Sequence, residues 1–115
     1  MSRKTRNNVA AQRRAHASAF AALGDETRLA LVARLAAGRP CSISQLTQGS
    51  RLTRQAIRKH LCVLETAGMV RSVRHGREHR FEFRSQPVDG IRQYLDFVSS
   101  QWDDALDRLK SFVES

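Results

Sequence analysis

Apolar positions recur at helical spacing from near the start of the chain. Residues 1–8 are basic and small polar with no apolar period, which predicts a disordered basic arm. The next fifteen residues place apolar or amphipathic side chains on one face, which predicts a first helix over 9–23. The positions on that face are Val9, His16, Phe20 and Leu23.

A second helix of about three turns is predicted after Asp25, a favourable N-terminal cap, and ends before Gly38. Residues 41–43 are then long enough only for a very short β-strand. Ser44 can cap a short helix that ends at Gln48.

A longer helix is predicted to begin after the cap Thr53 and to end at residues 67–68, where Gly68 supplies a C-terminal stop. One face of this helix forms an apolar stripe, consisting of Ala56, Ile57, Leu61 and Leu64. The opposite face carries Arg54, Gln55, Arg58, Lys59 and Cys62.

Residues 69–74 and 79–84 flank residues 75–78, and the second of these runs alternates apolar and charged side chains. The pattern predicts a two-stranded hairpin. Its tip is crowded with basic groups that repel one another unless an anion neutralises them, namely Arg74, His75, Arg77, His79 and Arg80.

The chain from 87 to 115 predicts one long helix whose apolar residues are spaced alternately four and three apart. Such a sustained 3.5-residue period favours a seam against another helix. A chain this small offers no obvious internal partner for it. The seam positions are Ile91, Leu95, Val98, Trp102, Ala105, Leu109 and Phe112.

The order of these elements predicts a mainly α fold with a small β-hairpin, a dimeric winged helix-turn-helix with the element order α-α-α-α-β-β-α. We expect an arm over 1–8, a DNA-binding domain over 9–86 and a dimerisation helix over 87–115 that packs with the first helix. The helix beginning at Thr53 is then the recognition helix, and the hairpin is the wing.

The exposed side chains of these two elements suit double-stranded DNA. Arginine can pair with guanine, glutamine with adenine, and threonine with a base edge or a phosphate, while more distant basic groups hold phosphate oxygens. The predicted DNA-binding residues are Thr53, Arg54, Gln55, Arg58, Lys59, Arg74, His75, Arg77 and Arg80.

Composition and charge agree with a polyanionic partner. The 115 residues carry a formal net charge of +9 and a sequence pI near 11.2. Residues 1–84 hold 17 of the 20 basic side chains, whereas residues 85–115 hold six of the 11 acidic ones. No stretch has the roughly 20 apolar residues of a membrane span, so we expect a cytoplasmic protein without membrane partners.

Three stretches resemble the ArsR-type repressor family: FAALGDETR at 20–28, SQL at 44–46 and AIRKHLCVLETAGMV at 56–70. The similarity covers about residues 15–84. It implies a homodimer assembled through the first and last helices, which adds Phe20 to the dimerisation residues Ile91, Leu95, Val98, Trp102 and Leu109. It also implies repression from a palindromic operator, and a packing role for His60.

The chain does not have the ligand residues of that family's metal sites. It therefore resembles the family members that lack these sites. Cys41 stands alone where a cysteine pair would be needed, and residues 88–115 contain no histidine to join Asp103, Asp104 and Asp107. We therefore expect no metal site and no cofactor. A metal pair of His75 with His79 is less favoured than DNA contact or solvent exposure.

Several alternatives remain open at this point. Cys41 and Cys62 lie near basic residues, so a thiol-responsive redox sensor repressor is one hypothesis, although free cysteines are commonly just packed. A nonspecific architectural DNA-binding protein and an interaction module built on the last helix are others. The sequence contains no motif for phosphate binding, nucleophilic catalysis or paired-cysteine metal ligation, so we expect no enzyme. The effector is unknown.

Overall fold

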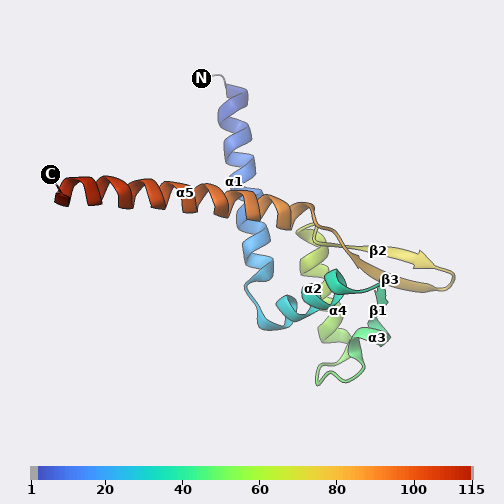
Figure 1. Cartoon of the computed structure of the whole chain (residues 1–115). Helices are drawn as coiled ribbons and strands as arrows, with labels where there is room; N and C mark the ends of the chain where they lie inside the picture. The colour runs from blue at the N-terminus through green and yellow to red at the C-terminus, as the bar shows by residue number, and fades with distance from the viewer. Residues whose placement is uncertain (1–2, 115) are drawn as a thin grey trace.

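The computed structural model describes residues 3–114 and confirms a mainly helical fold with a small antiparallel sheet (Figure 1). The short piece of strand expected within residues 41–43 is present at Cys41–Ser42, where it pairs with the predicted hairpin as a third strand. In chain order the elements are α1 (Arg3–Leu23), α2 (Glu26–Ala37), β1 (Cys41–Ser42), α3 (Ile43–Thr47), α4 (Arg54–Thr66), β2 (Val70–His75), β3 (Glu78–Phe83) and α5 (Gln86–Glu114).

The first helix begins earlier than the apolar pattern indicated. The backbone is already helical at Arg3, so the expectation of a disordered arm is corrected for residues 3–8, while Met1 and Ser2 lie outside the described residues. A helix that is nucleated over residues 9–23 gains one hydrogen bond for each residue added, and no proline or glycine interrupts residues 3–8.

The N-terminal cap of α2 is confirmed, and that of α3 is corrected. The side chain of Asp25 accepts from the backbone N–H of Arg28 over 3.0 Å. The short helix α3 is capped by Ser42 rather than Ser44. Ser42 Oγ accepts from the N–H of Gln45 over 3.2 Å, and Gln45 Oε1 accepts from the N–H of Ser42 over 2.8 Å. This reciprocal capping box satisfies two otherwise unpaired donors.

The recognition helix α4 has the predicted limits. Thr53 Oγ1 accepts from the N–H of Ala56 over 3.1 Å at its beginning. After Thr66 the chain turns at Gly68, whose φ of 77° lies in the left-handed region that favours glycine. Its apolar stripe is buried at Ile57, Leu61 and Leu64, and half-buried at Ala56.

The sheet has the strand order β1-β3-β2, and both pairings are antiparallel. His75 pairs with Glu78, which leaves a two-residue turn of Gly76 and Arg77. Gly76 has φ 62°, and within residues 3–114 only glycines have positive φ, so Arg77 does not; this is the sign pattern of a type II′ turn. This turn suits the twist of a hairpin and places Arg77 at its tip.

The core lies where α1, α2 and α4 meet the base of the sheet. The side chains of Leu61, Leu64 and Met69 are fully buried there, together with Ile57 and Val70 at 2% exposure or less. Because the core joins the recognition helix to the sheet, it fixes the base of the wing against α4. The remaining buried apolar residues are Ala19, Ala22, Leu31, Leu35, Leu46 and Ile91.

The last helix extends far beyond this core, and it crosses α1 near its own beginning (Figure 1). The radius of gyration is 19.0 Å, with principal extents of 67 × 36 × 21 Å. A compact domain of about 100 residues has a radius of about 13 Å. The chain is therefore too extended to bury its own apolar surface, and the excess lies on α5.

Candidate nucleic-acid interface

The predicted DNA-binding face of α4 is exposed as a whole. Arg54 and Gln55 occupy the first turn of the helix, and Arg58 and Lys59 follow one turn later. All four side chains are exposed, on the side opposite the buried Ile57 and Leu61 stripe. A helix with this distribution can present its N-terminal residues to a groove while the other face stays in the core.

Thr53 also lies on the exposed side, but its oxygen is engaged as the helix cap. A hydroxyl that accepts one hydrogen bond still has its own hydrogen to donate. Thr53 can therefore donate to a phosphate or base acceptor while it caps α4. This is a narrower role than the sequence suggested.

The register of the wing divides its basic residues between two faces. Side chains of cross-strand partners share a face, and successive residues alternate. Arg74 and its partner His79 therefore lie on one face, and His75 lies on the other with Glu78. Since His75 and His79 point to opposite sides of the hairpin, the register gives them no common metal position.

Ion pairs within the sheet reduce the number of free cations. Arg80 Nη2 lies 3.1 Å from Glu78 Oε2, and Arg80 is only half exposed. Near the base of the hairpin, Arg71 pairs with Glu82. Among the residues that the structure describes, none forms a salt bridge with Arg74 or Arg77, and both side chains are exposed. They are the better placed of the predicted wing residues for phosphate contact, whereas Arg80 is already partly neutralised.

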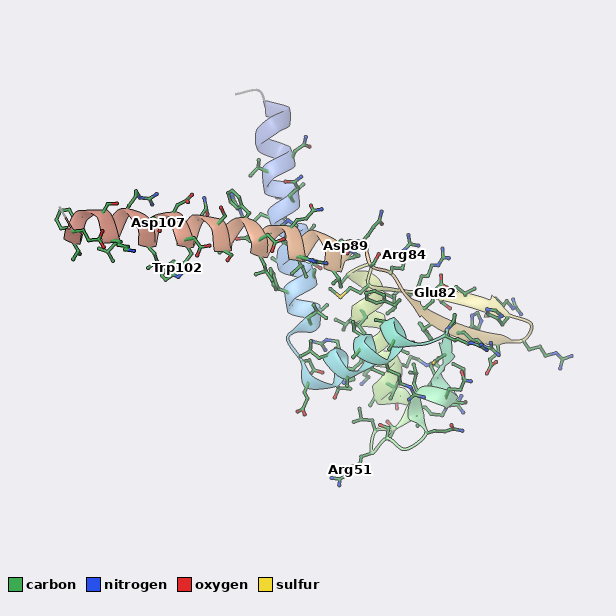
Figure 2. The ribbon with its side chains drawn as sticks, in the orientation of Figure 1. Arg51, Glu82, Arg84, Asp89, Trp102 and Asp107 are labelled. Atoms are coloured by element: carbon green, nitrogen blue, oxygen red, sulfur yellow. The ribbon has the colours of Figure 1, made fainter. Side chains whose placement is uncertain are left out.

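The sequence reasoning missed Arg51. It lies in the loop between α3 and α4, and Figure 2 shows its side chain projecting away from the body of the protein. The sequence did contain a signal for it, because Arg51 stands two residues before the cap Thr53 and therefore lies next to the start of α4. An exposed guanidinium beside the start of a recognition helix is available to a DNA backbone.

The predicted dimerisation residues of α5 fall into two groups. Ile91 is 6% exposed and belongs to the core, so it anchors α5 to its own chain rather than facing outward. The other seam residues are exposed: Leu95 50%, Val98 40%, Trp102 66% and Leu109 58%. Figure 2 shows Trp102 on the part of α5 that extends away from the core.

The apolar surface of α5 is broader than the seam. Phe97, Leu106 and Val113 are exposed as well, although they lie off the seam positions. On α1, Phe20 is 39% exposed and packs edge-on against Tyr94, with ring centroids 6.2 Å apart. Both helices therefore expose apolar side chains near the place where they cross.

The two cysteines are free thiols in different surroundings. Cys41 is half-buried in β1, where its thiol donates to the carbonyl oxygen of Arg39 over 3.3 Å. Cys62 is exposed on α4. Within residues 3–114, no three His, Cys, Asp or Glu side chains gather as metal ligands would. None of the described helices is both long and apolar enough to cross a membrane.

The exposed basic helix, the capped turn before it and the hairpin after it define a winged helix-turn-helix transcriptional regulator. A family model described as a helix-turn-helix domain matches residues 23–73. The chain is 37% identical over 78 residues to YuzN, an uncharacterized HTH-type transcriptional regulator of Bacillus subtilis, and the match covers 63% of this chain and 85% of YuzN.

Solved structures define the family more closely. An ArsR-like transcriptional regulator from Rhodococcus sp. RHA1 is 38% identical with a TM-score of 0.81, covering 89% of this chain and 93% of that one. The chain belongs to this ArsR-like family of winged helix regulators. A homodimeric winged helix-turn-helix DNA-binding domain from Mycobacterium bovis has the same fold at 18% identity, with a TM-score of 0.63 and coverage of 94% and 93%.

Proposed function

We propose that the protein is a sequence-specific repressor that binds a palindromic operator as a homodimer. The observation that supports it best is the exposed row of Arg54, Gln55, Arg58 and Lys59 at the start of α4. The first two can make bidentate contacts to guanine and adenine, and the other two can hold the flanking phosphates. Arg77 at the wing tip would add a backbone contact.

The extended shape supports the homodimer. A groove of about 710 Å³ lies between α1 and α5, lined by the aromatic side chains of Phe20, Tyr94 and Phe97 together with polar side chains. Together with Trp102 and Leu109 on the free part of α5, it forms a large exposed apolar surface of the kind that marks an interface. The related Mycobacterium bovis domain of the same fold is a homodimer.

Charge supports the same pairing. Arg13 and Arg14 are exposed on α1, whereas the free part of α5 carries Asp103, Asp104 and Asp107. In a twofold dimer each α5 can meet the partner's α1, so opposite charges would flank the apolar contact. Two recognition helices would then face half-sites about one helical turn apart.

The test is selection of bound genomic fragments followed by footprinting of the recovered site. We expect a palindromic footprint that survives excess nonspecific duplex, and an isolated promoter carrying it should lose transcription when the protein is added. Uniform protection of any duplex would instead support a nonspecific architectural protein and refute the proposal.

A thiol response can be tested in the same assay. The half-buried Cys41 and the exposed Cys62 lie on different elements, and no disulfide joins them. We expect diamide to leave operator affinity unchanged. A loss of affinity that the Cys62→Ser variant abolishes would establish the redox alternative.

A further inference from the structure

A polar cluster joins the end of α1 to the recognition helix. It consists of Arg28 in the first turn of α2, Asp25 at the cap of that helix, and His60 in the middle of α4. Arg28 and His60 are 32 positions apart in the chain, so the contact between them is tertiary. All three side chains are partly buried.

On one side, Arg28 caps α1. Its Nε donates to the carbonyl oxygen of Ala22 over 2.6 Å, and its Nη2 donates to that of Ala21 over 3.4 Å. The last carbonyls of a helix have no partner within the helix, and a cation there also interacts favourably with the helix dipole. The guanidinium thus fixes the direction in which the chain leaves α1.

On the other side, the same guanidinium reaches α4. Its Nη1 lies 3.3 Å from Nδ1 of His60. Arginine can only donate, so a hydrogen bond between these two atoms requires Nδ1 of His60 to be the acceptor. Asp25 Oδ2 accepts from the N–H of Arg28 and lies 3.8 Å from the same Nδ1.

We propose that Arg28 is a positioning residue for DNA recognition, which holds α4 at a fixed orientation to α1. The inference rests on the proposed function, in which α1 and α5 carry the dimer contact and α4 carries the base contacts. In such a dimer the distance between the two recognition helices depends on the path from α1 to α4. Arg28 is the side chain that bridges both ends of that path, so it sets which half-site spacing the dimer accepts.

The test compares Arg28→Lys and Arg28→Gln with the parent protein on the selected operator and on copies whose half-sites are one base pair closer or farther apart. Lysine keeps the charge but has one nitrogen, which cannot hold the α1 carbonyls and His60 together. We expect both variants to dimerise and to lose about tenfold in operator affinity. They should also discriminate less between spacings, whereas Arg28→Lys should bind nonspecific duplex as the parent does.

Arg34→Lys is a matched control in the same helix. Arg34 donates one hydrogen bond, from Nη2 to the carbonyl oxygen of Gln45 over 2.9 Å, which a lysine can replace. We expect this variant to keep both the affinity and the spacing preference of the parent. Thermal unfolding of all variants shows whether a variant has lost folding stability or only the orientation of α4 relative to α1.

His60 provides the second arm. In His60→Asn the amide oxygen can take the place of Nδ1 as acceptor, whereas His60→Leu removes the acceptor. We expect the asparagine variant to retain the spacing preference and the leucine variant to lose it. Combining Arg28→Gln with His60→Leu should cost no more than Arg28→Gln alone, because Arg28→Gln has already removed the contact with His60.

Unchanged spacing preference in Arg28→Lys and Arg28→Gln, or additive losses in the double variant, would overturn the role of Arg28 while leaving the proposed function intact. If the parent itself does not prefer an operator to competitor duplex, the proposed function fails and this inference falls with it.

Discussion

The backbone N–H of Ser72 donates to Glu65 Oε2 over 3.2 Å. Glu65 lies near the end of α4, and Ser72 lies in β2, so this hydrogen bond joins the wing to the recognition helix. In the proposed complex, base contacts by α4 and phosphate contacts by the wing are made together on one duplex. The bond helps to keep the two elements in register.

Glu65→Ala should therefore loosen the wing. The variant is expected to lose about 0.5–1.5 kcal/mol in the free energy of unfolding, because one hydrogen bond to a backbone donor is removed. Operator affinity should fall as well. Urea unfolding and operator titration measure the two effects, and Glu65→Gln, which keeps an acceptor, is the control. Equal stability of the alanine variant and the parent would contradict the linkage.

Replacing Arg54 and replacing Arg77 should affect different kinds of DNA binding, sequence-specific in the first case and nonspecific in the second. Arg54→Ala is expected to cost about 1–3 kcal/mol at particular base pairs, since the side chain sits at the first position of the recognition helix. Arg77→Ala should weaken binding to all duplexes alike and reduce the salt dependence. Titrations of operator and scrambled DNA at several salt concentrations distinguish them. An Arg54→Ala protein with the operator preference of the parent would refute the assignment.

Trp102→Asp should disrupt the dimer. The side chain is 66% exposed in the single chain, and a carboxylate in an apolar interface would be desolvated without a partner. Ser100→Asp, two positions earlier on the same helix and off the seam, is the control and should remain dimeric. Light scattering at micromolar concentration gives the mass of each. A dimeric Trp102→Asp protein would place the interface elsewhere.

The helix cap Asp25 should make the folding stability of the protein depend on pH in the acid range. The N–H of Arg28, which donates to its carboxylate, lowers the pKa of Asp25 below the ordinary 3.8, and the charge of Arg28 acts in the same direction. A carboxyl with a lowered pKa in the folded state stabilises fully above 3.8, and this contribution is lost as the pH falls through the folded value. The melting temperatures of the parent and Asp25→Asn should therefore converge below pH 3.8. A difference in melting temperature between the two proteins that stays constant down to pH 2 would contradict this role of the Asp25 carboxylate.

Local signals gave the recognition helix its correct limits. Thr53 caps it and Gly68 ends it, and both act through their own neighbours in the chain. The cap of α3 was predicted at Ser44 instead of Ser42 because both serines can cap. The deciding partner, Gln45, lies three residues after Ser42, which is the spacing of a capping box. That signal was present in the sequence.

Other features depend on tertiary packing, which a pattern along the chain does not contain. Ile91 fits the seam period as well as Leu95 does, yet the crossing of α1 and α5 buries the first and exposes the second. Likewise, nothing in the spacing of Arg28 and His60 indicates a contact between them. It arises where the end of α1 meets α4.

In the part of the chain that the structure describes, the strand order β1-β3-β2 leaves the outer side of β2 without a neighbouring strand. An unpaired edge of this kind is a template on which further strands can add, and so a starting point for aggregation. Here the exposed Arg74 lies in the edge strand, and the exposed Arg77 lies in the turn that follows it. Two such edges approaching each other bring like charges together, so the basic groups that suit the wing to a polyanion also keep the molecules apart when no DNA is present.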